Sequence, residues 1–191
     1  QPRLVVADLG TLQTLPKNEF RAGLAEVIKY GVISDPSLFE YLEKNTEKIL
    51  QLDNECLAHI VKTSCAIKAE VVEKDERESH YRMILNFGHT LGHAFEALTG
   101  YSRFIHGEAV AIGMVHAAKL SQQLGKCQEE ITKRLSELVR KCGLPIDMPD
   151  LDPQTIIDSL YHDKKTMNNK IKFILVKEIG VNEIVDDLPK E

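Results

Sequence analysis

Three histidines lie close together in the stretch from Leu85 to Met114, LNFGHTLGHAFEALTGYSRFIHGEAVAIGM: His89, His93 and His106. His89 and His93 are four residues apart on an expected helix, so their side chains lie on the same face. This spacing suits a metal ion, but HTLGH lacks the glutamate of the HExxH zinc motif, and such pairs are often surface or core residues. His106 strengthens the metal interpretation, because it opens a further helix after a turn and could meet the first helix across a packed pair.

A catalytic zinc site usually has three His, Glu or Asp ligands and keeps one position open for water or substrate. Glu26 is the least ordinary candidate carboxylate, since it lies between Ala25 and Val27 in the apolar segment GLAEVIKYG. A carboxylate buried there costs free energy unless it is paired or bound to a metal. Lys29, three residues further on, offers an ordinary ion pair as the alternative explanation. The other candidates are expected to be mostly solvated: Glu70, Glu78, Glu96 and Glu108.

Several basic residues occur in apolar surroundings or just before the C-terminal strands. Lys68 lies in CAIKAEVV, Arg82 precedes the apolar MIL, and Lys164 and Lys165 belong to HDKK. Each taken alone is explained by a long side chain that keeps its charge in water. Taken together with the carboxylate and histidine residues, they suggest a polyanionic substrate.

Four glycines accompany the histidines: Gly88, Gly92, Gly107 and Gly113. A glycine inside a helix costs about 1 kcal/mol relative to alanine, so this concentration needs a reason. One explanation is close packing of helices, and the other is close approach of the backbone to a ligand. The spacing alone does not separate the two.

The elements that must position these residues are mostly α-helices. Apolar residues recur at helical spacing along most of the chain, with Asn18 and Asp35 as expected N-caps and Pro36 at a first helical position. Near the C-terminus the period changes, and KIKFILVKEIGVNEIVDDL predicts two short strands around a turn at Gly180. RLVVAD predicts a short entry strand ending at Asp8. We expect helices over 19–34, 35–50, 54–79, 127–145 and 152–165, with two more in the histidine-rich stretch.

Composition excludes several classes of protein. The net charge of −5 argues against a nucleic-acid binder that works through a basic face. No window approaches the ~18–20 apolar residues of a membrane span, and no signal peptide is evident. The cysteines have no CxxC spacing, so a zinc–thiolate site is not expected and buried, reduced thiols in the cytoplasm are: Cys56, Cys65, Cys127 and Cys142.

The sequence resembles the 3-dehydroquinate synthase family. Five segments carry the resemblance, and they follow one another in the same order and with the same spacing as in that family: GLAEVIKYG, IKAEVV, DERES, LNFGHTLGHAFE and HGEAVAIGM. The resemblance spans nearly all of this chain but only the C-terminal half of the family's protein. It implies that residues 1–191 form a multi-helix, metal- and substrate-binding C-terminal domain, without the N-terminal NAD-binding α/β domain. The implied reaction, in the shikimate pathway, converts 3-deoxy-D-arabino-heptulosonate 7-phosphate to 3-dehydroquinate and phosphate. Its implied cofactors are NAD and a divalent metal, zinc or cobalt.

The resemblance also implies roles for individual residues, matched motif by motif. Glu26, His89 and His106 would bind the metal. Glu78 and His93 would transfer protons, with His93 near the departing phosphate. The substrate would contact these residues: Lys29, Lys68, Arg82, Asn86, and one of Lys164 and Lys165. The expected partners are the sugar phosphate, the N-terminal domain and a second copy in a homodimer, with no nucleic acid and no membrane.

Two departures from the family pattern affect these expectations. His80 stands where the family usually has glycine between the acidic residue and the arginine, which affects the placement of Glu78. No GxGxxG segment occurs, so the NAD site is not assigned.

The sequence also bears on three alternatives to this family. Another sugar-phosphate cyclase, such as a 2-deoxy-scyllo-inosose or valiolone synthase, is the main alternative, and Asn86 argues against it because those relatives tend to be acidic there. Iron-type alcohol dehydrogenases are similar in architecture but lack the combination of AEVIK and LNFGHT. A non-catalytic remnant would have no need to keep the implied ligands.

Overall fold

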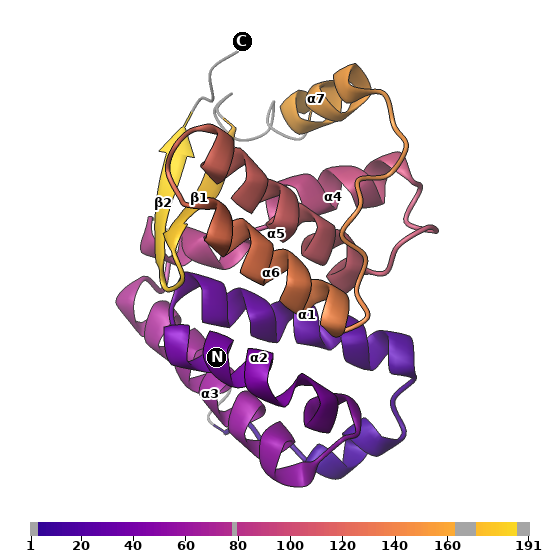
Figure 1. Cartoon of the computed structure of the whole chain (residues 1–191), viewed down its shortest axis with the longest axis vertical. Helices are drawn as coiled ribbons and strands as arrows, with labels where there is room; N and C mark the ends of the chain where they lie inside the picture. The colour runs from indigo at the N-terminus through magenta and orange to yellow at the C-terminus, as the bar shows by residue number, and fades with distance from the viewer. Residues whose placement is uncertain (1–3, 78–79, 163–170, 187–191) are drawn as a thin grey trace.

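The computed structural model describes residues 4–77, 80–162 and 171–186, which form a helical bundle with a β-hairpin along one side (Figure 1). The expected fold class, mostly α-helical with a hairpin near the C-terminus, is confirmed. The described elements in chain order are η1 (Leu9–Gln13), α1 (Lys17–Ile33), α2 (Pro36–Leu50), α3 (Asn54–Lys74), η2 (Tyr81–Asn86), α4 (His89–Leu98), α5 (His106–Gln123), α6 (Glu129–Lys141), α7 (Pro153–His162), β1 (Lys172–Glu178) and β2 (Val181–Asp186), where η denotes a 3-10 helix.

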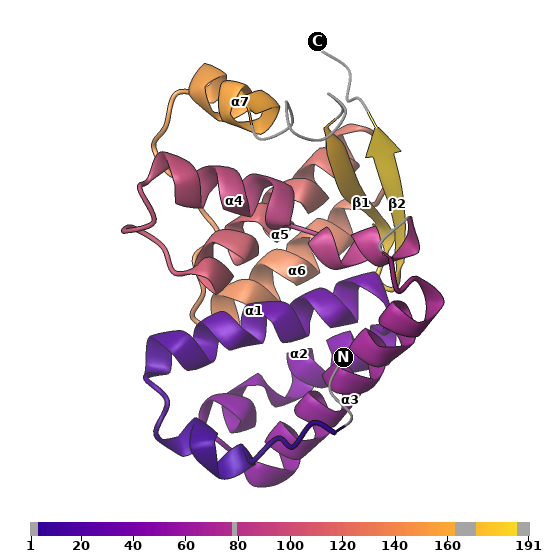
Figure 2. The ribbon, with the colours of Figure 1, turned by 180° about the vertical axis from the view of Figure 1, so that it is seen from behind.

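Helix α1 runs through the middle of the molecule, with α2 and α3 on one side and α4, α5 and α6 on the other (Figures 1 and 2). Helix α5 is the centre of the second group, because it packs against α1, α4, α6 and β1. The residues in its middle, 109–115, are buried on every side, including Val110, Ile112, Met114 and Val115. A helix segment that is apolar all round belongs in a core. This position brings the N-terminal end of α5 against both α1 and α4.

Close helix packing explains the glycines near the histidines. A Cβ atom on Gly113 would lie 2.0 Å from the carbonyl oxygen of Gly88, and one on Gly107 would lie 2.1 Å from that of Ala22. Neither position has room for a side chain, so α5 touches α4 and α1 through bare backbone. Gly88 also has φ +80, a left-handed conformation that favours glycine. Of the two explanations open from the sequence, the structure therefore supports packing.

Two apolar clusters form the core, and β1 lies between them. Ile174 and Val176 belong to the larger cluster, which α1, α2, α3, α5 and α6 also line. Phe173 and Leu175 belong to the smaller cluster, between α4, α5 and α7. The alternation follows from the strand, whose successive side chains point to opposite faces. The hairpin is antiparallel, with Phe173 opposite Val185, and its turn is at Gly180 as predicted.

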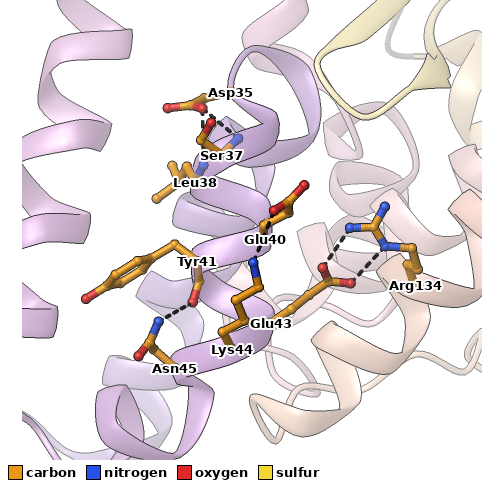
Figure 3. Close-up of polar contacts among 9 residues, drawn as sticks. All are labelled: Asp35, Ser37, Leu38, Glu40, Tyr41, Glu43, Lys44, Asn45 and Arg134. Atoms are coloured by element: carbon orange, nitrogen blue, oxygen red, sulfur yellow. Dashed lines mark hydrogen bonds and ion pairs between the residues drawn. The ribbon is translucent and has the colours of Figure 1, made fainter.

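Helix α2 begins as expected, with Asp35 as N-cap and Pro36 at the first helical position (Figure 3). The Asp35 carboxylate accepts hydrogen bonds from N–H groups of the first turn, the shorter from Ser37 at 2.9 Å. Further along α2, Glu43 accepts two hydrogen bonds from the guanidinium of Arg134 on α6, at 3.0 and 2.7 Å (Figure 3). This bidentate ion pair joins α2 and α6, which are far apart in the sequence.

Two predictions for the N-terminal region are wrong. Residues 4–8 of the expected entry strand form no strand, because the described chain places no strand edge beside them to complete their hydrogen bonds. Asp8 instead caps η1, where its carboxylate accepts a hydrogen bond from Gly10 N at 2.9 Å. Asn18 is not an N-cap, since α1 already begins at Lys17 and no side chain caps it.

Helix α3 ends at Lys74, earlier than the predicted end at residue 79. Asp75 leaves the helical conformation with φ −150, and its carboxylate accepts hydrogen bonds from the N–H groups of His80 at 2.8 Å and Arg82 at 3.1 Å. These bonds turn the chain towards η2, which carries Arg82 and Asn86.

Within the described residues, no helix is long and apolar enough to cross a membrane. The four cysteines were expected to be buried, reduced thiols. All four are free, but only Cys56 and Cys142 are buried; Cys127 is half-buried, and Cys65 is exposed, so the expectation is wrong for Cys65. Burial raises the pKa of the Cys142 thiol to about 12, so this group stays protonated at neutral pH.

Candidate metal centre

Glu26, His89 and His106 come together although they are far apart in the sequence. One ligand atom from each lies within 4.8 Å of the other two. Glu26 is in the middle of α1, whereas His89 and His106 are the first residues of α4 and α5. The glycine contacts between these helices allow the three side chains to converge.

The two carboxylate oxygens of Glu26 have different surroundings. Oε2 accepts a hydrogen bond from Lys29 Nζ at 2.6 Å, so the ion pair expected from the sequence is present. Oε1 is buried and has no hydrogen-bond partner. Lys29 is only 4% exposed, and burial lowers its pKa although Glu26 opposes the shift. A buried oxygen without a partner is costly, and a cation would satisfy it.

His89 presents its Nε2 atom to this oxygen. Its Nδ1 lies 3.1 Å from the carbonyl oxygen of Phe87, which can only accept, so Nδ1 carries the proton and Nε2 the lone pair. Nε2 lies 3.5 Å from Glu26 Oε1. Two ligands of a tetrahedral zinc ion are separated by about 3.4 Å, so this spacing fits a metal between them. Burial, together with the positive charge of Lys29, lowers the pKa of His89 to about 4, which keeps it in the neutral, metal-binding form.

His106 is oriented by a residue that the sequence did not single out. Its Nδ1 lies 3.2 and 3.3 Å from the two carboxylate oxygens of Glu96. Glu96 was expected to be solvated, but its side chain is only 11% exposed. Its place three residues after His93, in the apolar segment GHAFEAL, was the available signal. An i,i+3 spacing does not show by itself which face of a helix is buried.

His93 lies beside the three candidate ligands. Its ring centroid is 5.5 Å from that of His89 and 5.9 Å from that of His106, which it stacks against. His93, Glu96 and His106 form a second group with ligand atoms within 4.8 Å of one another. In this group, however, Glu96 already has a hydrogen-bond partner, whereas Glu26 Oε1 has none. The first group is therefore the better candidate for a metal.

The residues expected to contact substrate are placed only in part. Lys68 is exposed on α3, and its charge contributes to the lowered pKa of Lys29, so the two amines are near each other. Arg82 and Asn86 lie on η2, directly before α4, and the Arg82 guanidinium donates a hydrogen bond to the Glu76 carbonyl at 3.1 Å. Three expected site residues lie outside the described residues: Glu78, Lys164 and Lys165.

The fold matches solved structures of one enzyme class. A 2-epi-5-epi-valiolone synthase from Streptomyces hygroscopicus, with NAD+ and Zn2+ bound, matches over 95% of this chain and 51% of its own, with a TM-score of 0.87 and 25% identity. A 2-deoxy-scyllo-inosose synthase complexed with carbaglucose-6-phosphate, NAD+ and Co2+ matches over 97% and 53%, with a TM-score of 0.78 and 27% identity. The architecture is thus that of the sugar-phosphate cyclases.

Sequence comparison identifies the branch within this class. The family model for the 3-dehydroquinate synthase C-terminal region matches residues 23–166. The 3-dehydroquinate synthases of Desulforamulus reducens and Thermoanaerobacter pseudethanolicus are 52% and 51% identical over 98% and 96% of this chain. The chain belongs to the 3-dehydroquinate synthase family. It spans about half the length of these relatives, 53% and 52%.

Proposed function

We propose that this chain is the metal- and substrate-binding half of a 3-dehydroquinate synthase. The observation that carries the proposal is the convergence of Glu26, His89 and His106, with Glu26 Oε1 buried and unpartnered, in a chain of this family. The reaction would convert 3-deoxy-D-arabino-heptulosonate 7-phosphate to 3-dehydroquinate and phosphate. The sequence identity of about half to named 3-dehydroquinate synthases, against 25% and 27% to the other cyclases, favours this substrate over theirs.

Glu26, His89 and His106 would hold a divalent zinc or cobalt ion. Such an ion would supply Lewis-acid polarisation of the hydroxyl oxygen on the substrate carbon that is oxidised. Neighbouring groups would hold two of the ligand side chains in place before a metal binds. Lys29 fixes one oxygen of Glu26, and the Phe87 carbonyl fixes the proton of His89 on Nδ1. The free oxygen and the free Nε2 then face each other.

The residues proposed to contact the substrate would suit a molecule with a carboxylate and a phosphate. Lys68, Arg82 and Asn86 would bind and orient these groups, and a guanidinium is suited to a planar anion. One of Lys164 and Lys165 would bind an anionic end, and Glu78 would exchange protons. His93, which is exposed beside His106, would transfer a proton near the departing phosphate. The Lys29 side chain is almost fully buried and paired with Glu26, so its proposed substrate contact would occur beside Glu26.

NAD would supply the hydride acceptor, and its site is proposed to lie mainly in the part of the relatives that this chain does not span. The chain has no GxGxxG turn to cradle a pyrophosphate, and the two solved neighbours that carry NAD+ are about twice as long as the matched region. The proposal therefore includes an N-terminal NAD-binding domain. From the family resemblance, we also expect a homodimer in the cytoplasm for the complete protein.

A phosphate-release assay tests the proposal. The complete protein encoded by the gene is incubated with heptulosonate phosphate, NAD and zinc, beside the 191-residue chain alone. The complete protein should release phosphate and form 3-dehydroquinate, whereas the chain alone should be inactive. Carbocycle formation only from a different sugar phosphate would assign another cyclase activity. Robust turnover by the chain alone would contradict the two-domain proposal.

A further inference from the structure

Glu96 is a carboxylate in an unusual position for its charge. It lies in the last turn of α4, directly after the buried Phe95, and its side chain is only 11% exposed. The side-chain partner that the structure gives it is the Nδ1 atom of His106, nearly equidistant from both oxygens at 3.2 and 3.3 Å. Burying a carboxylate is costly unless hydrogen bonds compensate, so this contact has a physical consequence for both groups.

The contact determines which nitrogen of His106 is free. An ionised carboxylate only accepts hydrogen bonds, so Nδ1 must carry the proton and donate it to Glu96. The lone pair of the neutral ring is then on Nε2. His106 needs this constraint more than His89 does, since His106 is 51% exposed and His89 only 14%. An exposed imidazole without a partner can rotate and exchange tautomers.

We propose that Glu96 is a positioning residue for the metal ligand His106. It holds the ring in the Nδ1–H tautomer and in one orientation, so that Nε2 is the atom that binds the metal together with Glu26 and His89. Glu96 itself is not a ligand. This inference rests on the proposed metal site and adds to it the residue that orients its most exposed ligand.

The rival arrangement is a metal bound by His93, Glu96 and His106. Two observations argue against it. The Glu96 oxygens are already at hydrogen-bond distance from His106 Nδ1, and the unpartnered buried oxygen in this region belongs to Glu26. A single His106 ring can serve both neighbours, with Nδ1 towards Glu96 and Nε2 towards the metal.

Replacing Glu96 by Gln tests the positioning role while keeping the shape of the side chain. The amide can turn either its oxygen or its NH2 group towards His106, so it no longer selects one tautomer. Loss of a hydrogen-bond partner behind a histidine ligand typically weakens metal affinity by about 10–100-fold. We expect a loss of that size for Glu96→Gln, without loss of the one-to-one stoichiometry.

Glu108→Gln is the matched control. Glu108 is two residues from His106 and its carboxylate accepts a hydrogen bond from the Ile105 backbone N–H at 3.2 Å. Glutamine can also occupy this position of a helix start, so the fold should be kept. This control removes a neighbouring negative charge without touching the His106 ring, and zinc affinity should change by less than about 3-fold, well under the 10-fold effect expected at the orienting contact.

The experiment measures zinc affinity by competition with a chromophoric chelator, on the full chain and both variants. In parallel, 15N NMR of the metal-free proteins reports the tautomer of His106, which a merely structural role of Glu96 would leave unchanged. The inference predicts the Nδ1–H tautomer in the parent and a mixture in Glu96→Gln. Unchanged affinity and tautomer in Glu96→Gln would overturn it.

Two further outcomes are distinguishable. A parent chain that binds no zinc would contradict the proposed metal site and not the orienting contact, which the tautomer still reports. Complete loss of zinc in both Glu96→Gln and His93→Ala would overturn the inference in favour of the rival ligand set.

Discussion

Nε2 of His89 lies 3.5 Å from Oε1 of Glu26, and no hydrogen bond joins the two atoms. The proton of His89 is held on the other nitrogen by Phe87, so two lone pairs face each other across this gap. Such an arrangement is unfavourable by itself and favourable around a cation. His106 lies close enough to complete a three-ligand set.

Removing His106 should therefore remove the metal. We expect His106→Ala to lose zinc at chelator concentrations at which the parent retains one ion per chain, because two ligands bind far more weakly than three. Elemental analysis after dialysis measures the stoichiometry. His93→Ala is the matched control, since it removes a neighbouring imidazole that is not a proposed ligand. Full zinc retention by His106→Ala, or zinc loss in His93→Ala, would contradict the ligand assignment.

His93 should matter for turnover instead. In the complete protein, His93→Ala should lower kcat by about 10²–10⁴-fold, the usual contribution of an acid–base group. Zinc content, measured on the same preparation, should be unchanged. A variant with near-parental kcat would show that proton transfer near the phosphate is carried by another group.

The glycine contacts predict opposite effects for two similar substitutions. Gly113→Ala should lower the free energy of unfolding by about 1–3 kcal/mol, because its Cβ would lie 2.0 Å from Gly88 O and force α4 and α5 apart. Gly23→Ala, on α1 with nothing within 4 Å of the added atom, should raise it by about 0.5–1 kcal/mol. Urea unfolding of both variants measures the difference. Equal effects at the two positions would contradict the packing argument.

The cap of α2 predicts a smaller effect on stability. Asp35→Ala removes the acceptor for the Ser37 and Leu38 N–H groups and should cost about 1 kcal/mol. Lys44→Ala is the comparison on the same helix (Figure 3). It breaks an exposed pair with Glu40 at 3.2 Å and should cost less than about 0.5 kcal/mol. Chemical denaturation of both variants should give this order, and the reverse order would contradict it.

We expect His116 to lower the free energy of unfolding at mildly acidic pH. Burial lowers its pKa, although Nε2–H donates to the Ile146 carbonyl at 3.2 Å. As pH falls through the unfolded value of about 6.5, the unfolded chain binds a proton that folded His116 resists, so the free energy of unfolding decreases. His116→Gln should reduce this slope between pH 7 and 5. An NMR titration midpoint for His116 at or above 6.5 would contradict the prediction.

Local features of the structure were predictable from the sequence. Asp35 and Pro36 mark the start of α2, and Gly180 marks the hairpin turn, because caps and turns depend on residues only a few positions apart. The wrong strand prediction near the N-terminus has a long-range cause. Residues 4–8 have strand-forming side chains, but a strand exists only if another segment pairs with it, and neighbouring residues do not supply that information.

The sequence by itself determined the family and the histidine motifs, since these are properties of residue type and spacing. Only the tertiary structure decided that the glycines serve helix packing, that Glu26 has one oxygen without a partner, and that Glu96 is buried against His106. The physical reason is that burial and long-range contacts arise when α1, α4 and α5 pack together. A carboxylate such as Glu96 has the same local sequence whether it faces water or an imidazole from the next helix.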